Sequence, residues 1–191
     1  MKQSMQLKRN LGVLGAFAAA FLCTYSNTPE AVAQDGNVAG EKDSEGWIKL
    51  YEPNVYQEMP YRLMKPINYD SEMRYPVIVS LHGGGGSGSD NRKQLRGWNK
   101  PLAEEKLRAE YPSYVLAPQA DHLWDAAHLQ KIKDIIAALP SVDMNRIYIL
   151  GHSMGGHGTN ILIQIDPSYF AAAAPSAGTG RPQDEDFIDA T

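Results

Sequence analysis

A serine lies where a short apolar run gives way to small residues, and its surroundings are those of a nucleophile. The run at 147–150 is followed by Gly151-His152-Ser153-Met154-Gly155, which has the spacing G-x-S-x-G. In such a segment a strand ends in a strained turn before a helix, so that the serine Oγ points to solvent. The two glycines leave room that a Cβ would fill. The pattern therefore predicts that Ser153 attacks a carbonyl carbon.

A second segment could stabilise the oxygen of that carbonyl. Residues 76–81 form an apolar run that predicts a buried strand, and His82 and the glycine-rich segment 83–88 follow it. Acyl transfer places negative charge on the carbonyl oxygen, and each backbone N–H directed at it is worth about 3–4 kcal/mol. We expect the donors to be the amides of Gly84 and of Met154, the latter at a helix start. A phosphate site is not expected, because no G-K-[ST] follows the glycines.

These motifs and two further segments resemble the α/β-hydrolase superfamily. Within it they are similar to secreted bacterial esterases and peptidases related to polyhydroxybutyrate depolymerases, feruloyl esterases and the prolyl oligopeptidase catalytic domain. The segments are 74–91 (RYPVIVSLHGGGGSGSDN), 114–119 (YVLAPQ), 145–159 (NRIYILGHSMGGHGT) and 170–178 (FAAAAPSAG). The resemblance implies an α/β-hydrolase fold, a mostly parallel sheet flanked by helices with the substrate at the carboxyl ends of the strands. It also implies a triad in the chain order Ser, acid, His.

The acid and the base of such a triad have no good candidate in this sequence. The one histidine after Ser153 is His157, which lies one helical turn later and follows the helix surface. We expect His82 to brace the glycine-rich segment and His152 to pack. The acidic residues at 184–189 form a charge run, which is typical of a solvated face. We therefore expect the chain to be truncated before the triad acid and histidine, to lack carboxyl-terminal strands, and to be inactive as given.

One loop contains residues for a substrate pocket and residues that could bind a metal. It follows the expected strand 114–117, and we expect Gln119 and Trp124 to line the pocket. Its spacing D-H-x-x-D-x-x-H comprises Asp121, His122, Asp125 and His128. The two histidines are six residues apart, whereas a helical metal site needs both on one face. We therefore expect no metal, and we expect no cofactor.

Residues 1–33 have the pattern of a secretory signal peptide. Basic residues precede an apolar stretch at 11–22, and Ala31-Val32-Ala33 is an A-x-A cleavage site. The stretch of 12 residues is too short to span a bilayer. We expect a secreted or periplasmic protein that begins near Gln34. The single cysteine, Cys23, would leave with the signal peptide, so no disulfide is expected.

Composition and charge fit one globular enzyme domain after this leader. The chain is 43% hydrophobic and 21% charged, with a formal net charge of −4. We expect a disordered linker at 34–46 and the hydrolase domain at 47–191. An acidic chain without a basic cluster is poorly suited to nucleic acid or to an anionic membrane. The expected partner is a small-molecule or polymeric ester substrate, with no nucleic acid and no stable membrane association, while the oligomeric state stays open.

Hydrophobic spacing predicts alternating strands and helices, which is typical of a parallel sheet with right-handed crossovers. The expected strands are 61–64, 76–81, 114–117, 147–150 and 170–175. The expected helices are one from 89 or 90 to 108, broken at Pro101, and two more at 129–139 and 154–165.

Three functions fit this sequence. The one we favour is a secreted serine hydrolase that cleaves carboxylic esters through an acyl-enzyme on Ser153, with the acid and base beyond residue 191. A serine peptidase of prolyl oligopeptidase type shares the same turn and glycine-rich segment. The third is an inactive truncated remnant that keeps the cleft without the base.

Overall fold

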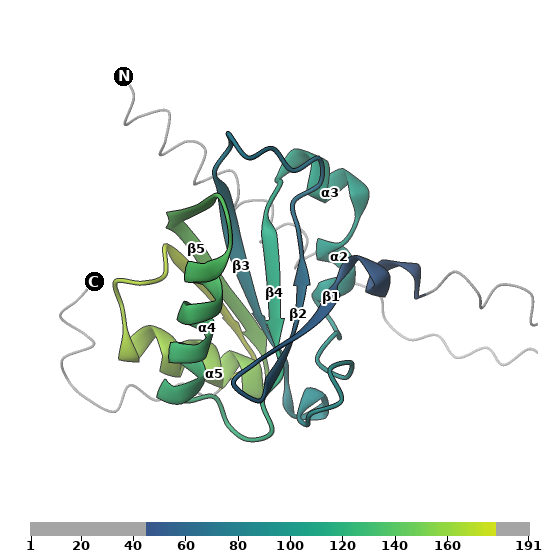
Figure 1. Ribbon diagram of the computed structural model, residues 1–191. Coiled ribbons are helices and arrows are strands. Elements are labelled where there is room, and N and C mark those ends of the chain that lie inside the picture. Colours follow the sequence, from purple (N-terminus) through teal and green to yellow (C-terminus); the bar gives the residue numbers. More distant parts are fainter. Residues whose placement is uncertain (1–44, 179–191) are drawn as a thin grey trace, which may run out of the picture. The chain divides into compact units, whose positions relative to one another are not determined.

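The structure, a computed structural model, describes residues 45–178 of the chain. This part forms a six-stranded sheet with helices packed against it (Figure 1). The expected signal peptide at 1–33, nearly all of the linker at 34–46 and the acidic run at 184–189 lie outside the described residues. Among the residues at 45–178, no helix has the length and apolar character that crossing a membrane requires.

The sheet is mostly parallel. It consists of β1 (Glu52–Tyr56), β2 (Met59–Met64), β3 (Tyr75–Leu81), β4 (Tyr114–Pro118), β5 (Val142–His152) and β6 (Ala172–Ser176). The strands lie in the order β1-β2-β4-β3-β5-β6. β3 is parallel to β4 and to β5, and β5 is parallel to β6, while β1 and β2 are antiparallel to their neighbours. The expected α/β fold class is confirmed.

Within residues 45–178, two long helices and four short ones accompany the sheet. They are η1 (Gly46–Leu50), η2 (Gly84–Gly86), α2 (Asn99–Leu102), α3 (Glu105–Glu110), α4 (Ala126–Ala138) and α5 (Met154–Ile165). Figure 1 shows α4 and α5 next to each other on one face of the sheet, and α5 contacts β5 and β6. The helical spacing of Leu129, Ile132 and Ile136 buries these side chains of α4 in the core.

The central strands explain why the sequence indicated this fold so clearly. Every residue of β3 and of β4 is buried. Parallel strands that are covered on both faces form continuous apolar runs rather than alternating ones. The runs at 76–81 and 114–117 therefore predicted these strands to within one residue at each end.

The sequence did not predict β1, which forms a hairpin with β2. The turn between them is Gln57-Glu58, and both residues have positive φ, 44° and 67°. Hairpin turns with two such residues normally contain Asn-Gly or Asp-Gly, so the usual turn signal is missing here. β1 lies at the edge of the sheet and its residues are exposed or only partly buried, which weakens its hydrophobic pattern.

The expected helix from 89 or 90 to 108 is wrong over its first half. Asp90 Oδ1 accepts hydrogen bonds from the amides of Arg92 and Lys93, both at 2.9 Å, and holds a turn there. Helical structure starts only at Asn99 in α2 and again at Glu105 in α3. The sequence does not distinguish an aspartate that caps a turn from one that caps a helix, because in both cases the carboxylate accepts hydrogen bonds from amides two or three residues later.

Candidate active site

The sheet places Ser153 on a strained turn between β5 and α5. Its φ is 56° and its ψ is −119°, a conformation that non-glycine residues rarely adopt, and its side chain is exposed. A Cβ at Gly151 would collide with the backbone of Gly155, and a Cβ at Gly155 would collide with the carbonyl of Leu81. Both glycines are therefore required by close backbone packing, as the motif indicated.

The turn is fixed by hydrogen bonds on both sides. Ser153 N donates to Ser176 O at 2.9 Å and so ties the turn to β6. His157 N donates to Ser153 O at 2.9 Å, which is the first hydrogen bond of α5. The amide of Met154 precedes that bond and has no acceptor within the helix. With the positive end of the helix dipole beside it, this amide is suited to stabilise an anion next to Ser153.

The glycine-rich segment passes directly beside the serine. An added Cβ at Gly83 would lie 3.1 Å from His152 O and 3.5 Å from Ser153 Cβ. The chain then enters η2, whose first hydrogen bond joins Gly86 N to Gly83 O at 2.9 Å. The amide of Gly84 precedes this bond, and an added Cβ at Gly84 would meet no atom within 4 Å. The predicted second donor thus lies at an open position one residue from the contact with Ser153.

His82 braces the glycine-rich segment, as expected. Ala120 N donates to Nε2 of His82 at 2.9 Å, so the ring proton is on Nδ1, which donates to Gly83 O at 2.8 Å. A Cβ at Gly86 would lie 2.6 Å from His82 Cβ, so the segment wraps closely around this side chain. Burial lowers the pKa of His82, opposed by the hydrogen bond to Gly83 and assisted by the charge of His128. The buried ring is therefore neutral and braces the loop.

The two residues expected to line the substrate pocket are buried beneath the glycine-rich segment. Gln119 is 1% exposed, and its Nε2 donates to Gly86 O and to Asp90 Oδ1, both at 3.0 Å. Its Oε1 accepts from Asn91 N at 2.6 Å. Trp124 is 2% exposed, packs on Gly158 of α5 and donates from Nε1 to His82 O at 3.3 Å. Their contacts support the glycine-rich segment, and neither side chain forms open surface.

The remaining histidines near Ser153 differ from each other. His157 is partly buried on α5, one turn after the serine, where the sequence placed it. His152 was expected to pack, but it is exposed, and its ring meets the edge of Trp98 with the centroids 6.4 Å apart. His152 is the last residue of β5, where the strand passes into the exposed turn at Ser153.

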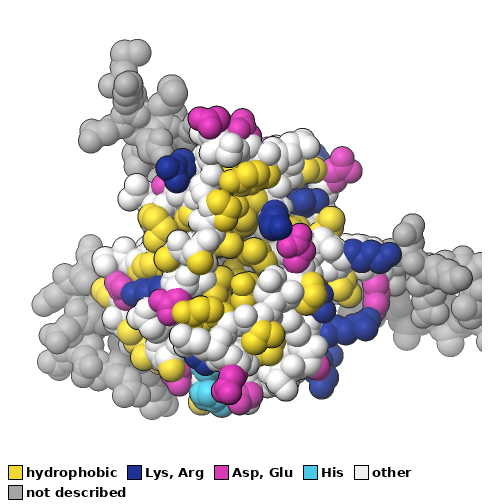
Figure 2. Space-filling model, in the orientation of Figure 1, with side chains coloured by type: hydrophobic (Ala, Val, Ile, Leu, Met, Phe, Trp, Pro, Cys, Tyr) yellow, Lys and Arg dark blue, Asp and Glu magenta, His cyan; other side chains and the backbone are white. Residues whose placement is uncertain are grey.

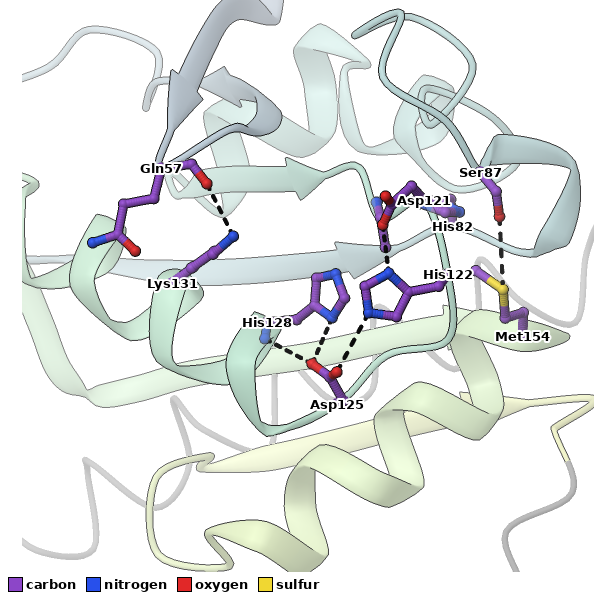
Figure 3. A network of polar contacts seen from close by, with 10 residues as sticks. Gln57, His82, Ser87, Asp121, His122, Asp125, His128, Lys131 and Met154 are labelled. Carbon is purple, nitrogen blue, oxygen red and sulfur yellow. Dashed lines mark hydrogen bonds and ion pairs between the residues drawn. The ribbon is translucent and has the colours of Figure 1, made fainter.

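The structure also brings together side chains at which the sequence predicted no metal site. Asp121, His122 and His128 each place a potential ligand atom within 4.8 Å of the others. The rings of His122 and His128 have centroids 4.7 Å apart (Figure 3). Hydrogen bonds to Asp121, then to Asp125, raise the pKa of His122. Asp121 and His122 of this cluster lie in the loop between β4 and α4, and His128 lies in the first turn of α4.

The chain is similar to known esterases in sequence and in structure, although no family model matches it. A thermostable esterase of known structure is 32% identical and superposes with a TM-score of 0.67, covering 75% of this chain and 45% of the esterase. The acetyl xylan esterase from Aspergillus awamori is 20% identical with a TM-score of 0.51, covering 64% of this chain and 47% of that enzyme.

A curated relative comes from the fungus Arthroderma benhamiae and is described as an uncharacterized secreted protein. It is 34% identical over 136 residues, which cover 62% of this chain and 14% of the relative. The chain thus spans less than half of each of these three proteins. The strand order, the mostly parallel sheet and the esterase neighbours together show that the chain has the fold of the α/β-hydrolase superfamily.

Proposed function

We propose that this chain supplies the nucleophile and the oxyanion-binding amides of a secreted serine hydrolase that cleaves carboxylic esters. The observation that carries the proposal is the exposed Ser153 on its strained turn, with the backbone of Gly83 against it. Such strain persists only where surrounding structure enforces it, and here two glycines and a hydrogen bond to β6 do so. A turn of this kind serves to present a nucleophile.

The reaction follows the usual course of acyl transfer. Ser153 Oγ forms a bond to the ester carbonyl carbon, and its proton passes to a histidine that we expect, with its acid partner, beyond residue 191. The carbonyl oxygen becomes an oxyanion, to which the amides of Met154 and Gly84 donate. The alcohol leaves with the proton from the histidine, and water then hydrolyses the acyl-enzyme on Ser153.

Two observations support an ester substrate and an extracellular location. The esterase with a TM-score of 0.67 is 32% identical, so the likeness extends beyond the fold. The amino-terminal pattern of a signal peptide agrees with the description of the fungal relative as secreted. We therefore propose that the substrate is a small-molecule or polymeric carboxylic ester and that the protein acts on it outside the cytoplasm.

The test uses the full-length protein, including any residues beyond 191. We expect Ser153 to react with a fluorophosphonate and the protein to hydrolyse p-nitrophenyl acetate. Ser153→Ala should abolish labelling and lower turnover by up to about 10⁶-fold. Ser168→Ala, at an exposed serine in the turn after α5, should leave both unchanged.

A matched amide, p-nitroacetanilide, separates an esterase from a peptidase. We expect the amide to be cleaved far more slowly than the ester. Labelling that persists in Ser153→Ala would contradict the assignment of the nucleophile. Equal rates on the ester and the amide would contradict the substrate class and leave the nucleophile in place.

A further inference from the structure

The loop from Gln119 to Asp125 joins β4 to α4 and brings two histidines and two aspartates together. Figure 3 shows the ring of His122 between the carboxylates of Asp121 and Asp125, with the ring of His128 beside it. In Figure 2 a histidine flanked by acidic side chains lies on the surface at the lower edge of the molecule. None of these four side chains takes part in the chemistry proposed for Ser153.

The two histidines come together without sharing a helical face, contrary to the expectation from their spacing. His122 lies in the loop before α4, and His128 lies in the first turn of α4. Asp125 is the N-cap of α4 and accepts from His128 N at 3.0 Å. This cap turns the loop back on the helix, so residues six positions apart have ring centroids 4.7 Å apart.

Asp125 also orients both rings. Its Oδ1 is 2.7 Å from Nδ1 of His128, and its Oδ2 is 3.4 Å from Nε2 of His122. When these nitrogens carry the protons, Nε2 of His128 and Nδ1 of His122 keep their lone pairs for a ligand. A carboxylate that fixes the tautomer of a histidine in this way is the usual partner of a metal-binding imidazole.

We propose that Asp121, His122 and His128 bind one divalent transition-metal ion of the Zn²⁺ class, with Asp125 as the carboxylate that orients both histidines. Two imidazoles and one carboxylate suit Zn²⁺ better than Mg²⁺ or Ca²⁺, which prefer oxygen ligands. A water molecule completes a tetrahedral shell, because the side chains of Asp121 and His122 are 76% and 61% exposed. The ion takes the place of the proton between Nδ1 of His122 and Oδ1 of Asp121.

The dimensions of the cluster fit this ion after small side-chain rotations. Tetrahedral coordination with bonds of about 2.0–2.1 Å sets neighbouring ligand atoms about 3.3 Å apart. The three ligand atoms already lie within 4.8 Å of one another. His128 is the fixed member, since its side chain is 7% exposed and its ring packs on Trp124 with centroids 5.3 Å apart. Asp121 and His122 are the exposed members that rotate to close the site.

The position of the cluster indicates a structural role for the ion. Trp124 lies against both His128 and His82, whose ring centroids are 5.3 and 4.9 Å from its own. His82 in turn holds the glycine-rich segment through Gly83. An ion at Asp121, His122 and His128 therefore links the loop to the start of α4. The contacts from His128 through Trp124 to His82 continue from there to the glycine-rich segment beside Ser153. The inference does not depend on the function proposed for that serine.

Equilibrium dialysis against Zn²⁺, with the untagged full chain, tests the proposal. We expect one ion per chain and a loss of affinity of at least about tenfold in His122→Ala, which removes an exposed ligand. Asp125→Asn tests the orienting role of Asp125 without removing the helix cap, because asparagine also caps helices well. Its Nδ2 would face Nε2 of His122 and hold the proton on Nδ1, so we expect binding about 10–100-fold weaker with α4 intact.

His152→Ala is the matched control, since His152 is an exposed histidine outside the cluster. It should bind Zn²⁺ as the unsubstituted chain does. Co²⁺ gives a second measurement: visible absorption typical of a tetrahedral site should develop with one equivalent and be lost in His122→Ala. A lack of stoichiometric binding, or the same loss in His152→Ala as in His122→Ala, would overturn the proposal.

Discussion

The turn around Ser153 and the loop between β4 and α4 lie at the same edge of the sheet but are determined in different ways. β4 and β5 are both parallel to β3, so both segments leave the sheet at its carboxyl edge. The turn depends on Gly151 and Gly155, whose close backbone contacts exclude a Cβ, and these two glycines lie within five residues of the sequence even though Gly155 packs on the distant Leu81. The loop is enforced by residues distant in sequence, such as His82, whose Nε2 accepts from Ala120 N. A local constraint is visible in a sequence motif, whereas a tertiary one is not.

Apart from the loss of Ser153 itself, the largest effect on activity is expected at Gly84 of the glycine-rich segment. Gly83 has φ −79° and ψ 179°, the extended conformation that a residue before proline prefers, so Gly84→Pro fits the backbone. The substitution removes the amide proposed to stabilise the oxyanion, and kcat for p-nitrophenyl acetate should fall about 10²–10³-fold.

Gly84→Ala is the control for that substitution. It keeps the amide, and its Cβ meets no atom within 4 Å, so kcat should stay within about threefold of the unsubstituted enzyme. Full activity in Gly84→Pro would show that another amide, such as that of Gly83, is the donor.

The constraint within the turn predicts a large effect on stability. Gly151→Ala would drive a Cβ into the backbone of Gly155, which is held by α5 and by Leu81. We expect the free energy of unfolding, measured in urea, to fall by about 3 kcal/mol. Gly85→Ala, whose Cβ would meet only Arg96 Nη1 at 3.6 Å, should change it by less than about 1 kcal/mol. Similar losses in both variants would mean that the turn is no more constrained than the glycine-rich segment.

The loop between β4 and α4 is held to the glycine-rich segment and the turn after it by the hydrogen bonds of Gln119. Gln119→Glu keeps the shape of the side chain but turns its donor toward Gly86 O and Asp90 Oδ1 into an acceptor. We expect a loss of about 1–3 kcal/mol in the free energy of unfolding, because buried groups are left without partners. Gln130→Glu, at an exposed glutamine that donates to Asp134 Oδ1 at 2.8 Å, should cost less than about 0.5 kcal/mol. Equal losses at both positions would remove the support role given to Gln119.

The difference between the two segments also explains what could be predicted from the sequence. The strands β3 and β4, helix α5 and the placement of Ser153 follow from apolar runs and from one motif, and the sequence predicted them closely. The sequence predicted Gln119 and Trp124 as pocket-lining residues, whereas both are buried, and their burial depends on contacts with residues up to 42 positions away in the chain. The cluster of Asp121, His122 and His128 was rejected on helical spacing, because the turn made by Asp125 could not be foreseen.

His82 joins the two segments, and its ionisation tests how tightly they are joined. Burial lowers its pKa in the folded chain below the value of about 6.5 for an unperturbed histidine. The unfolded chain therefore binds more protons than the folded chain as the pH falls below about 6.5, and stability is lost in that range. Above this range both states are neutral, and the contribution of His82 is fully present.

His82→Asn isolates this effect from the other histidines. The amide of asparagine can still donate to Gly83 O, but it offers no acceptor at the position of Nε2 to Ala120 N, so the variant should be less stable by about 1 kcal/mol at neutral pH. On acidification from about pH 7.5 to about pH 5.5, the unsubstituted chain should lose more stability than the variant, and the two curves should converge. Urea unfolding at several pH values measures both. Curves that stay parallel would show that His82 keeps an ordinary pKa, and hence that water reaches its ring and the glycine-rich segment is not closed over it.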